Sequence, residues 1–490
     1  MVNLSLVRST ALIGMLSSII GGCALAPLDL TTVDKPAPAY GACFAQFEHS
    51  DEVIKNAGVR DAQNPSVRGF PYLRTSRFLA SFRDELTTEK KRSAGINQLA
   101  ELDVAGWKIE VRNLSPEQRP PETDVQALDR CRTLLVDIAL EDPIAFDQIR
   151  KHSVVADSYQ IWARTLGLYP LTSLFVLRGV DRLQTDEGRY FKDTAPRTNH
   201  AEKHIAYGLT TYEAEDGHLN TVQQTTRDAL DIPRFESDIL SKLFVRHSPV
   251  WSVASLSPDD RIGSVAYSPN GITVSTETPS VYTHLTYTKF NGDVLAQLNY
   301  TIWFPARPQE GAIDILSGTL DGITWRVTLD TSGRMLFADA MHNCGCYYMA
   351  FPTDAMRPRD PPRVFEEPLW IPQSLSPSGN AQVVIHISKI AHYIRKIEFS
   401  NELAIDKQLL PVAYSELRSL PIAPGMYKSM FEPNGLIKGS ERAERWLLWP
   451  MGIASAGAMR QVGHHAIAFI GRRHFDDPDL LDRYFESTQP

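Results

Sequence analysis

The sequence predicts an α+β protein: a helical N-terminal region, then an antiparallel β-meander, then a mixed C-terminal part. Two observations lead to this prediction. Apolar residues recur at helical spacing over much of residues 41–245, and their period changes to two between 246 and 352. Asn-Gly and Asp-Gly pairs, such as Asn291-Gly292 and Asp321-Gly322, separate several of the period-two segments, and such pairs are the strongest short-range signal for β-hairpins.

Composition limits the function classes. The chain has 490 residues, 43% of them hydrophobic, which is enough for two or three domains with cores of their own. Its formal net charge is -8, so it lacks the excess of Lys and Arg that neutralises phosphates, and we expect no nucleic-acid partner. The sequence has no Walker loop, Rossmann glycine fingerprint, His-Glu-x-x-His motif or Gly-x-Ser-x-Gly elbow, which disfavours the corresponding enzyme classes.

The first 23 residues carry a targeting pattern. One charge, Arg8, precedes apolar and small residues that end in Ile20-Gly21-Gly22-Cys23, a stretch too short for a permanent transmembrane helix. This pattern resembles the lipobox signal peptide of bacterial lipoproteins. The resemblance implies removal of residues 1–22 and lipidation of Cys23, so that the chain hangs from a membrane by its lipid. The alternative is an ordinary secretory signal that contains a cysteine by chance.

The residue after Cys23 bears on the location. Ala24 stands where an aspartate would indicate retention in the inner membrane, so the resemblance implies the outer membrane, with the protein facing the periplasm. We therefore expect the membrane as one partner and an envelope protein as another. Residues 23–40, which are rich in proline, are expected to form an extended tether.

Within the helical region, we predict a helix over 77–86, a second beginning near Asp124, and a third beginning at Asp142-Pro143. An apolar stretch over 159–177 is interrupted by Gly167 and Pro170. The meander should contain strands at 262–267, 272–276, 282–290, 294–304, 312–320, 324–330 and 335–340, closed into a barrel or packed as a sandwich. Residues 353–490 should form a proline-rich linker, strands at 382–387, 392–399 and 466–470, and helices at 440–449 and 480–485, packed on the β domain.

Cysteine use suggests a disulfide. Four cysteines remain once Cys23 is lipidated, and an even number in an oxidising compartment favours disulfides. Of the three possible pairings, Cys43 with Cys131 is the natural long-range choice. It leaves the close pair Cys344 and Cys346 for each other or for a metal.

The strongest candidate for chemistry is the segment His342-Asn343-Cys344-Gly345-Cys346, directly after the last strand of the meander. If Gly345 lets the chain turn, one imidazole and two thiolates could hold zinc or copper, with His284 on an earlier strand as the fourth ligand. Two other interpretations stay open: a strained Cys344–Cys346 disulfide that is easily reduced, and a structural turn whose thiols only pack.

Two further histidine groups are weaker candidates. His200 and His204 would share a helix face at i, i+4, the spacing that a metal can bridge. A C-terminal group could bind an anion or transfer protons, although salt-bridged seams look the same in sequence. Its members are His464, His465, Arg472, Arg473, His474, Asp476 and Asp477. The run Asp259-Asp260-Arg261 indicates an exposed turn.

The sequence therefore predicts a lipid-anchored envelope protein, non-catalytic, that binds a ligand or assists assembly and has a metal or redox-sensitive cysteine site. The alternative is a metal- or thiol-dependent envelope enzyme that uses His342, Cys344 and Cys346. A binding protein should have an open groove lined with apolar residues. An enzyme should bring His342 and the two cysteines into a cleft together with a carboxylate.

Overall fold

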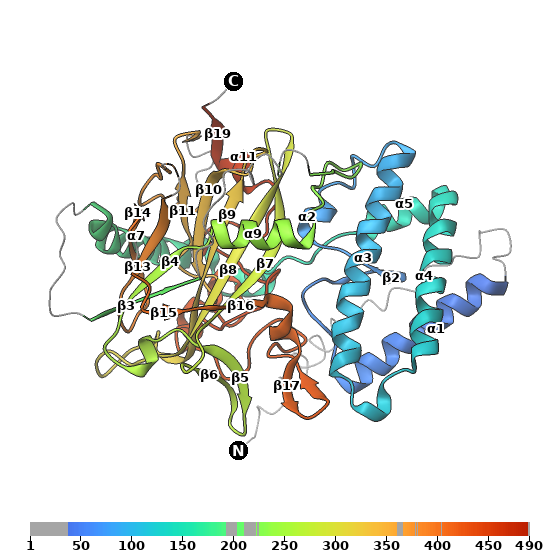
Figure 1. Ribbon diagram of the computed structural model, residues 1–490, viewed down its shortest axis with the longest axis horizontal. Coiled ribbons are helices and arrows are strands. Elements are labelled where there is room, and N and C mark those ends of the chain that lie inside the picture. The colour runs from blue at the N-terminus through green and yellow to red at the C-terminus, as the bar shows by residue number, and fades with distance from the viewer. Residues whose placement is uncertain are drawn as a thin grey trace, which may run out of the picture.

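The computed structural model describes residues 38–192, 203–209, 222, 225–359, 366–377, 379, 381–402 and 404–488. The predicted signal peptide, Cys23 and His200 lie outside these ranges. The described chain is an α+β protein, as predicted, with a group of helices beside a body built on two sheets (Figure 1). The six-stranded sheet is open, so the barrel alternative for the meander is wrong.

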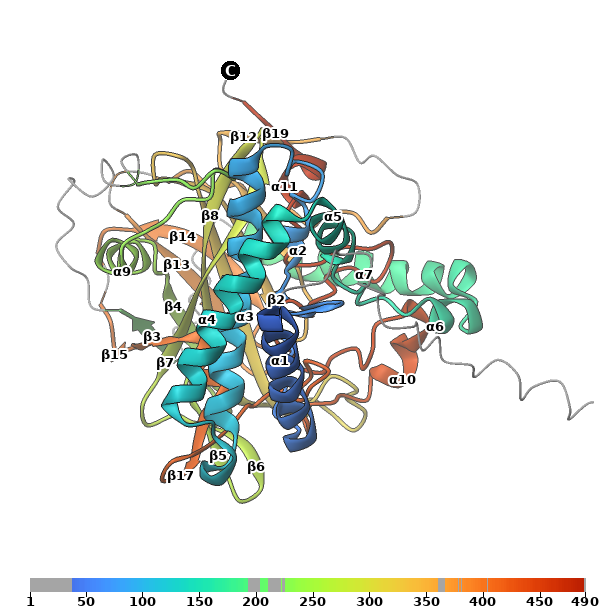
Figure 2. The ribbon, with the colours of Figure 1, turned by 90° about the vertical axis from the view of Figure 1, so that its right-hand side faces the viewer.

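The N-terminal helices form a separate layer beside the sheets, as two perpendicular views show (Figures 1 and 2). Their apolar faces share one core cluster, which also takes in the hairpin β1–β2 and contains residues such as Phe70, Leu99 and Leu135. Asp142 caps one helix as predicted, since its side chain accepts a hydrogen bond from Ile144 N and Pro143 follows it. The elements are α1 (Pro38–Ala57), β1 (Ser66–Val67), β2 (Phe70–Arg74), α2 (Arg77–Ala80), α3 (Glu89–Asn113), η1 (Pro116–Gln118), α4 (Glu122–Glu141) and α5 (Pro143–His152).

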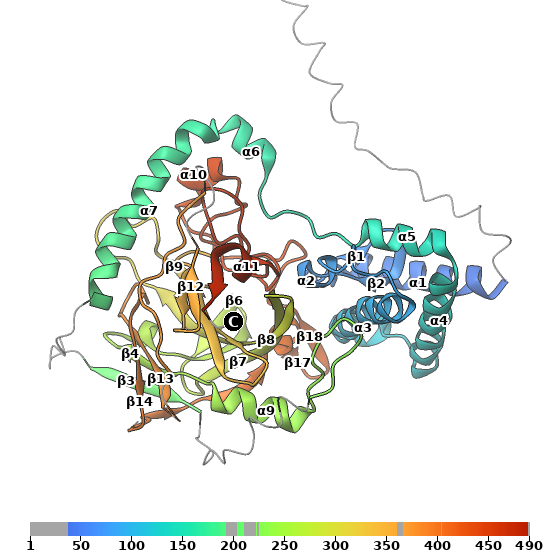
Figure 3. The ribbon, with the colours of Figure 1, turned by 90° about the horizontal axis from the view of Figure 1, so that it is seen from above.

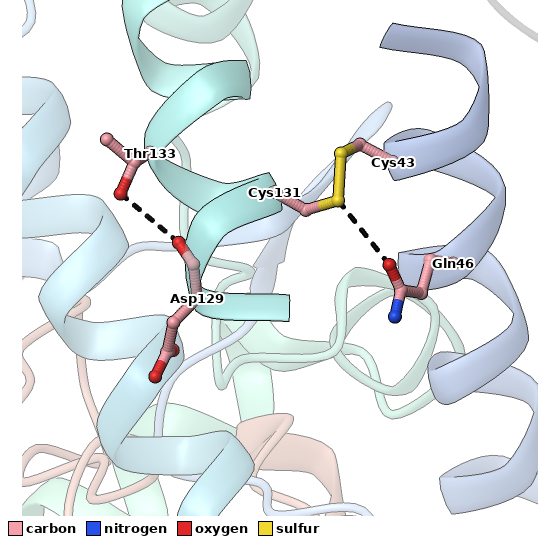
Figure 4. The surroundings of a disulfide bond; sticks show 5 residues. All are labelled: Cys43, Gln46, Asp129, Cys131 and Thr133. Atoms are coloured by element: carbon pink, nitrogen blue, oxygen red, sulfur yellow. Dashed lines mark hydrogen bonds between the residues drawn. A yellow bond between two sulfur atoms is a disulfide. The ribbon is translucent and has the colours of Figure 1, made fainter. Parts of the chain in front are cut away.

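A disulfide joins α1 to α4 within this layer (Figure 4). Cys43 and Cys131 have Cα atoms 5.1 Å apart and are 88 residues apart in sequence. The structure thus has the pairing that was predicted from the cysteine count. Gln46, one turn after Cys43 on α1, lies with its Oε1 3.4 Å from the Cys131 sulfur.

The meander forms the centre of the body. Five antiparallel strands follow one another in sequence order, and β16 adds to the outer edge of β7 in parallel, which gives the order β11-β10-β9-β8-β7-β16. One face of this sheet is apolar and packs against a second sheet of order β14-β13-β4-β3-β15 through a shared core. The strands of the first sheet are β7 (Ser280–Phe290), β8 (Asp293–Arg307), β9 (Gly318–Leu329), β10 (Met335–His342), β11 (Met349–Pro352) and β16 (Leu410–Ala413).

The second sheet draws its strands from both halves of the chain. It contains β3, which lies inside the region predicted to be helical, so that part of the predicted pattern is wrong. Its strands are β3 (His204–Gly208), β4 (Val250–Ala254), β13 (Gln382–Ile387), β14 (Ile394–Ser400) and β15 (Lys407–Gln408), with α9 (Ser237–Arg246) between β3 and β4 in sequence. Short pairs complete the body: β5 (Ser264–Ser268) with β6 (Gly271–Ser275), β12 (Met356–Pro358) with β19 (Phe485–Ser487), and β17 (Leu420–Ala423) with β18 (Met426–Lys428).

Three further predictions of the meander and C-terminal part are wrong. Residues 312–317 form a loop, and Asp321-Gly322 is no hairpin turn, because β9 runs through it from Gly318 to Leu329. Residues 466–470 form no strand and make only an isolated bridge between Ala466 and His474. The remaining short helices are η2 (Pro258–Asp260), η3 (Tyr414–Arg418), α10 (Arg445–Leu448), η4 (Trp449–Met451) and α11 (Leu480–Tyr484).

Two helices follow the outside of the body. α6 (Ile161–Leu166) and α7 (Tyr169–Lys192) run along its rim, with α10 beside them (Figure 3). The break between α6 and α7 falls at Gly167, as the sequence indicated. A Cβ at Gly167 would lie 2.4 Å from Cβ of Pro450, so only glycine allows this turn to pack so closely on η4.

Candidate ligand-binding site

The segment that contains the close cysteine pair folds into a tight turn at the end of β10. The amide of Gly345 donates to the carbonyl of His342 at 2.7 Å, and the amide of His342 donates to the carbonyl of Cys346 at 3.0 Å. Gly345 has a φ of +92°, and a Cβ there would lie 2.5 Å from the carbonyl oxygen of Ala466. The expected turn at Gly345 is therefore present, and it requires glycine.

The predicted metal ligands do not converge. His284 pairs with Asn299 across β7 and β8, whereas His342 pairs with Ile323 across β10 and β9. Following these pairs across the ladders places the two histidines on opposite faces of the sheet, because successive residues of a strand alternate between faces. The four-ligand zinc or copper site is therefore wrong. Within the described residues, no three His, Cys, Asp or Glu side chains are placed to hold a metal ion.

The two thiols stay together after the turn. Both are free in this structure; Cys344 is buried and Cys346 is partly exposed. The amide of Cys346 donates to the sulfur of Cys344 at 3.3 Å. A hydrogen bond between the two thiols lowers the pKa of Cys344 and raises the pKa of Cys346. Cys344 is thus the thiol that ionises first, although it is the more buried of the two.

The cysteine turn forms part of the wall of a pocket of about 340 Å³ beneath α7. The inner face of α7 covers one side, and segments near the C-terminus form the other. Most of the lining is aliphatic or aromatic, including Val176, Val180 and Leu183 of α7. The remaining lining residues are Gly179, Gln184, Leu316, Cys344, Gly345, Cys346, Tyr347, Tyr348, Glu367, Trp370, Glu444, Leu448, Ile453, Ala456, Gly457, Ala466, Ile467, Ala468 and Phe469.

Two acidic side chains give the pocket its polar positions. Glu367 is already occupied, since its Oε2 accepts a hydrogen bond from Phe469 N at 2.7 Å. Glu444 is 7% exposed, and no described residue donates a hydrogen bond to its carboxylate. Burial raises the pKa of Glu444, although the charge of Arg442 opposes the shift. A Cβ at Gly457 would lie 2.1 Å from Glu444 Oε1, so glycine makes room for this carboxylate.

Behind the pocket wall lies a buried charged cluster centred on Asp321. His392 Nδ1 lies 2.9 Å from one oxygen of Asp321, and Arg442 Nη2 lies 3.3 Å from the other. The second nitrogen of His392 is 3.4 Å from Asp260, at ion-pair distance. His392 also stacks on Phe304, with ring centroids 3.9 Å apart. The cluster ties η2, β9 and the loop before β14 together.

His342 belongs to this cluster and does not line the pocket. Its Nδ1 lies 3.6 Å from Asp321. Burial lowers the pKa of His342, so this imidazole is neutral. Burial would lower the pKa of His392 as well, but contacts with Asp260 and Asp321 outweigh it and raise that pKa above its ordinary value. The two carboxylates therefore favour the charged form of His392 over the charged form of His342.

The sequence interpretation missed most of these residues. Asp260 was assigned to an exposed turn and Asp321 to a turn between strands, yet both side chains are fully buried. A signal existed for Asp260, because Ser257 and Asp260 have the spacing of a capping box, and the box is formed in η2. We find no comparable local signal for Glu444 or His392, whose partners are distant in sequence.

The two weaker histidine candidates have structural roles where they are described. His204 begins strand β3, so the shared helix face proposed with His200 is wrong. His474 contacts Asp157 at 3.2 Å and Asp477 at 3.3 Å, which joins the C-terminal part to the loop before α6. The other members of that group also make structural contacts. Three contact backbone carbonyls: His464 that of Ala62, His465 that of Asn343 and Arg473 that of Glu367. The other two form ion pairs, Arg472 with Asp157 and Asp476 with Arg77.

In comparisons with known proteins, no family model, no curated protein and no solved structure matches the chain.

Proposed function

We propose that this chain is a non-catalytic binding protein of the bacterial cell envelope that holds a small, largely apolar ligand beneath α7. The observation that carries the proposal is the pocket of about 340 Å³, which lies within the size range of small-molecule sites and is lined mainly by apolar side chains. Membrane attachment through lipidated Cys23, and a location at the outer membrane facing the periplasm, belong to the same proposal and rest on the lipobox resemblance.

The placement of His342 supports binding over catalysis. A thiol-dependent enzyme needs a base within reach of its nucleophile. Here the pocket contains Cys344, Cys346 and Glu444, but the imidazole of His342 is directed at Asp321 behind the wall. Cys344 lines the pocket but is only 6% exposed. The pocket therefore has the size and lining of a binding site, without a histidine beside the thiols.

Glu444 suggests one feature of the ligand. Glu444 lines the pocket, and its carboxylate accepts no hydrogen bond from the described residues, so its oxygens remain open to the pocket. A donor that meets a carboxylate in a mainly apolar pocket forms a charge-assisted hydrogen bond, so a ligand that supplies a donor is favoured there. We propose a ligand with an apolar body and one hydrogen-bond donor that meets Glu444.

Two glycines of α7 allow a matched test. A side chain at Gly179 would enter the pocket, whereas Gly188 lies on the same helix away from it, and a Cβ at either meets no atom within 4 Å. We expect Gly179→Phe to weaken binding of the dye N-phenyl-1-naphthylamine, an apolar amine that fluoresces when shielded from water, at least tenfold. Gly188→Phe should bind it like the wild type. Both changes favour the helix to a similar extent.

The titration uses the whole mature chain with Cys23→Ser, exported behind an ordinary secretory signal so that no lipid is attached. Failure of the wild type to bind the dye would refute an accessible apolar pocket. Equal affinities of the Gly179→Phe and Gly188→Phe variants would show that the dye binds elsewhere.

A further inference from the structure

The outer side of α6, the first half of α7 and α10 exposes large apolar side chains that no other described part of the chain covers. The exposed fraction reaches 72% at Phe175, 71% at Leu166 and 70% at Trp446. Monomeric soluble proteins seldom expose so many neighbouring large apolar residues without a partner. We call this set the apolar face: Ile161, Trp162, Leu166, Leu168, Leu171, Leu174, Phe175, Trp446, Leu447 and Trp449.

The apolar face is one rigid surface. Arg164 of α6 donates from Nε to the carbonyl of Met451 at 2.8 Å and from Nη2 to the carbonyl of Gly471 at 2.7 Å. The close approach of Gly167 to Pro450 joins the turn between α6 and α7 to η4. α6, α7 and α10 lie on the same side of the body in two perpendicular views (Figures 2 and 3). The exposed side chains are therefore held in place, and they do not belong to a fraying terminus.

The charge around this face is unusual for the chain. Asp and Glu outnumber Lys and Arg overall, 58 to 50, yet residues 161–180 contain no acidic residue and two arginines, of which Arg164 is bonded to carbonyls of the body. Arg178 is exposed on α7, and the guanidinium of Arg445 lies over the ring of Trp446. Cationic side chains among exposed aromatic and aliphatic ones are the pattern of helices that lie in the headgroup layer of an anionic membrane.

We propose that the apolar face docks on the surface of a lipid bilayer, with α6 and the start of α7 lying in the interfacial layer. Trp162, Trp446 and Trp449 suit that layer, because indole rings prefer the boundary between headgroups and acyl chains. Among the described residues, no helix combines the length and apolar character needed to cross a membrane.

The length of chain before α1 limits how far a lipid anchor can lie from the body. The first described residue is Pro38, and fourteen residues separate it from the membrane anchor if Cys23 is lipidated. Such a segment spans at most about 50 Å when extended. A lipid anchor would keep the bilayer within that reach and raise its effective concentration at the apolar face. This step alone rests on the proposed function, because the apolar face itself does not depend on Cys23.

The pocket and the apolar face share α7. The helix directs Val176 and Val180 into the pocket and Leu171, Leu174 and Phe175 outward, and only Ser173 of its 24 residues is buried. Leu448 of α10 also lines the pocket, between the exposed Leu447 and Trp449. Docking would therefore place the pocket next to the lipid surface. An apolar ligand could then pass from the bilayer into the pocket.

The test measures flotation of the unlipidated mature chain, carrying Cys23→Ser, with vesicles of phosphatidylethanolamine and phosphatidylglycerol. We expect the wild type to float with the vesicles, and Phe175→Glu and Trp446→Glu each to bind at least tenfold more weakly. The matched control is Ile144→Glu in α5 of the N-terminal helical layer, where the side chain is 54% exposed. Figure 3 shows α5 apart from α6, α7 and α10, so this variant should bind like the wild type. Circular dichroism checks that each variant is folded.

Absence of wild-type flotation would overturn the proposal, as would equal binding of all the variants. Sedimentation velocity tests the alternative that the apolar face binds another protein chain instead of lipid. A wild-type dimer that Phe175→Glu dissociates, without any flotation, would assign the face to a second copy of the chain and overturn docking on lipid. Gly179→Phe distinguishes this proposal from the ligand pocket, because it should float normally even if it binds no dye.

Discussion

α3 and α7 are almost equally long, 25 and 24 residues, but they are used in opposite ways. Nine residues of α3 are buried, whereas only Ser173 of α7 is. The buried residues of α3 include the charged Asp103 and Glu110, while the exposed residues of α7 include Leu174 and Phe175. The contacts around a helix thus decide which of its residues are buried: α3 buries charged side chains, and α7 exposes apolar ones.

The charges of α3 are tolerated because arginines neutralise them. Arg74 of β2 lies 3.2 Å from Asp103 and 2.6 Å from Glu110, and Arg132 of α4 lies 2.9 Å from Asp103. Gly106 makes room for this arrangement, since a Cβ there would lie 2.5 Å from Arg74 Nη1. On α7 the ion pair Arg182–Asp186, at 3.9 Å, is largely exposed. Glu187 of α7 pairs with Arg395 of β14 at 3.2 Å, but neither side chain is as deeply buried as the charges of α3.

The largest effect is expected where the buried charges of α3 lose their partner. Arg74→Met should lower the free energy of unfolding by about 3–5 kcal/mol, because Asp103 and Glu110 keep buried charges that nothing else fully compensates. Urea denaturation followed by circular dichroism measures it. The control is Arg182→Met on α7, an exposed pair, where the loss should be at most about 0.5 kcal/mol. Comparable losses in both variants would mean that burial does not distinguish the two helices.

The disulfide gives the next largest effect. Replacing both Cys43 and Cys131 with alanine should lower the free energy of unfolding by about 2–4 kcal/mol, mainly because the unfolded chain regains the freedom of a long loop. Denaturation with and without reductant measures it: reductant should weaken the wild type and leave the double variant unchanged. If reductant weakens both proteins equally, the stabilising bond is a different one.

The smallest effect is expected on α7. Leu174→Ala should change the free energy of unfolding by no more than about 0.5 kcal/mol, because the side chain is 55% exposed and its removal opens no cavity. Leu99→Ala on α3, where the leucine is 5% exposed, should cost about 2–5 kcal/mol. A large loss in the Leu174→Ala variant would show that α7 packs on a part of the protein in solution and would argue against docking on lipid.

Local patterns in the sequence sufficed for the class of fold and for several of its parts. The period-two segments from β7 to β10 form a meander because hairpin turns join neighbouring strands, so their pairing needs no distant information. Asp142-Pro143 starts α5 because a cap and a first-turn proline act within one helical turn. The disulfide between Cys43 and Cys131 could be predicted because four cysteines allow only three pairings.

The tertiary structure alone decided what the polar residues do. Asp321 was expected in a turn because Asp-Gly usually marks one, but β9 continues through it, and Arg442, His342 and His392 surround the carboxylate. His284 and His342 were expected to share a metal, but the pairing register puts them on opposite faces of the sheet. Register and long-range burial depend on contacts between residues far apart in the chain, and no local pattern encodes them. For the same reason, the pocket with Glu444 and the apolar face could be recognised only once α7 and α10 were placed beside each other.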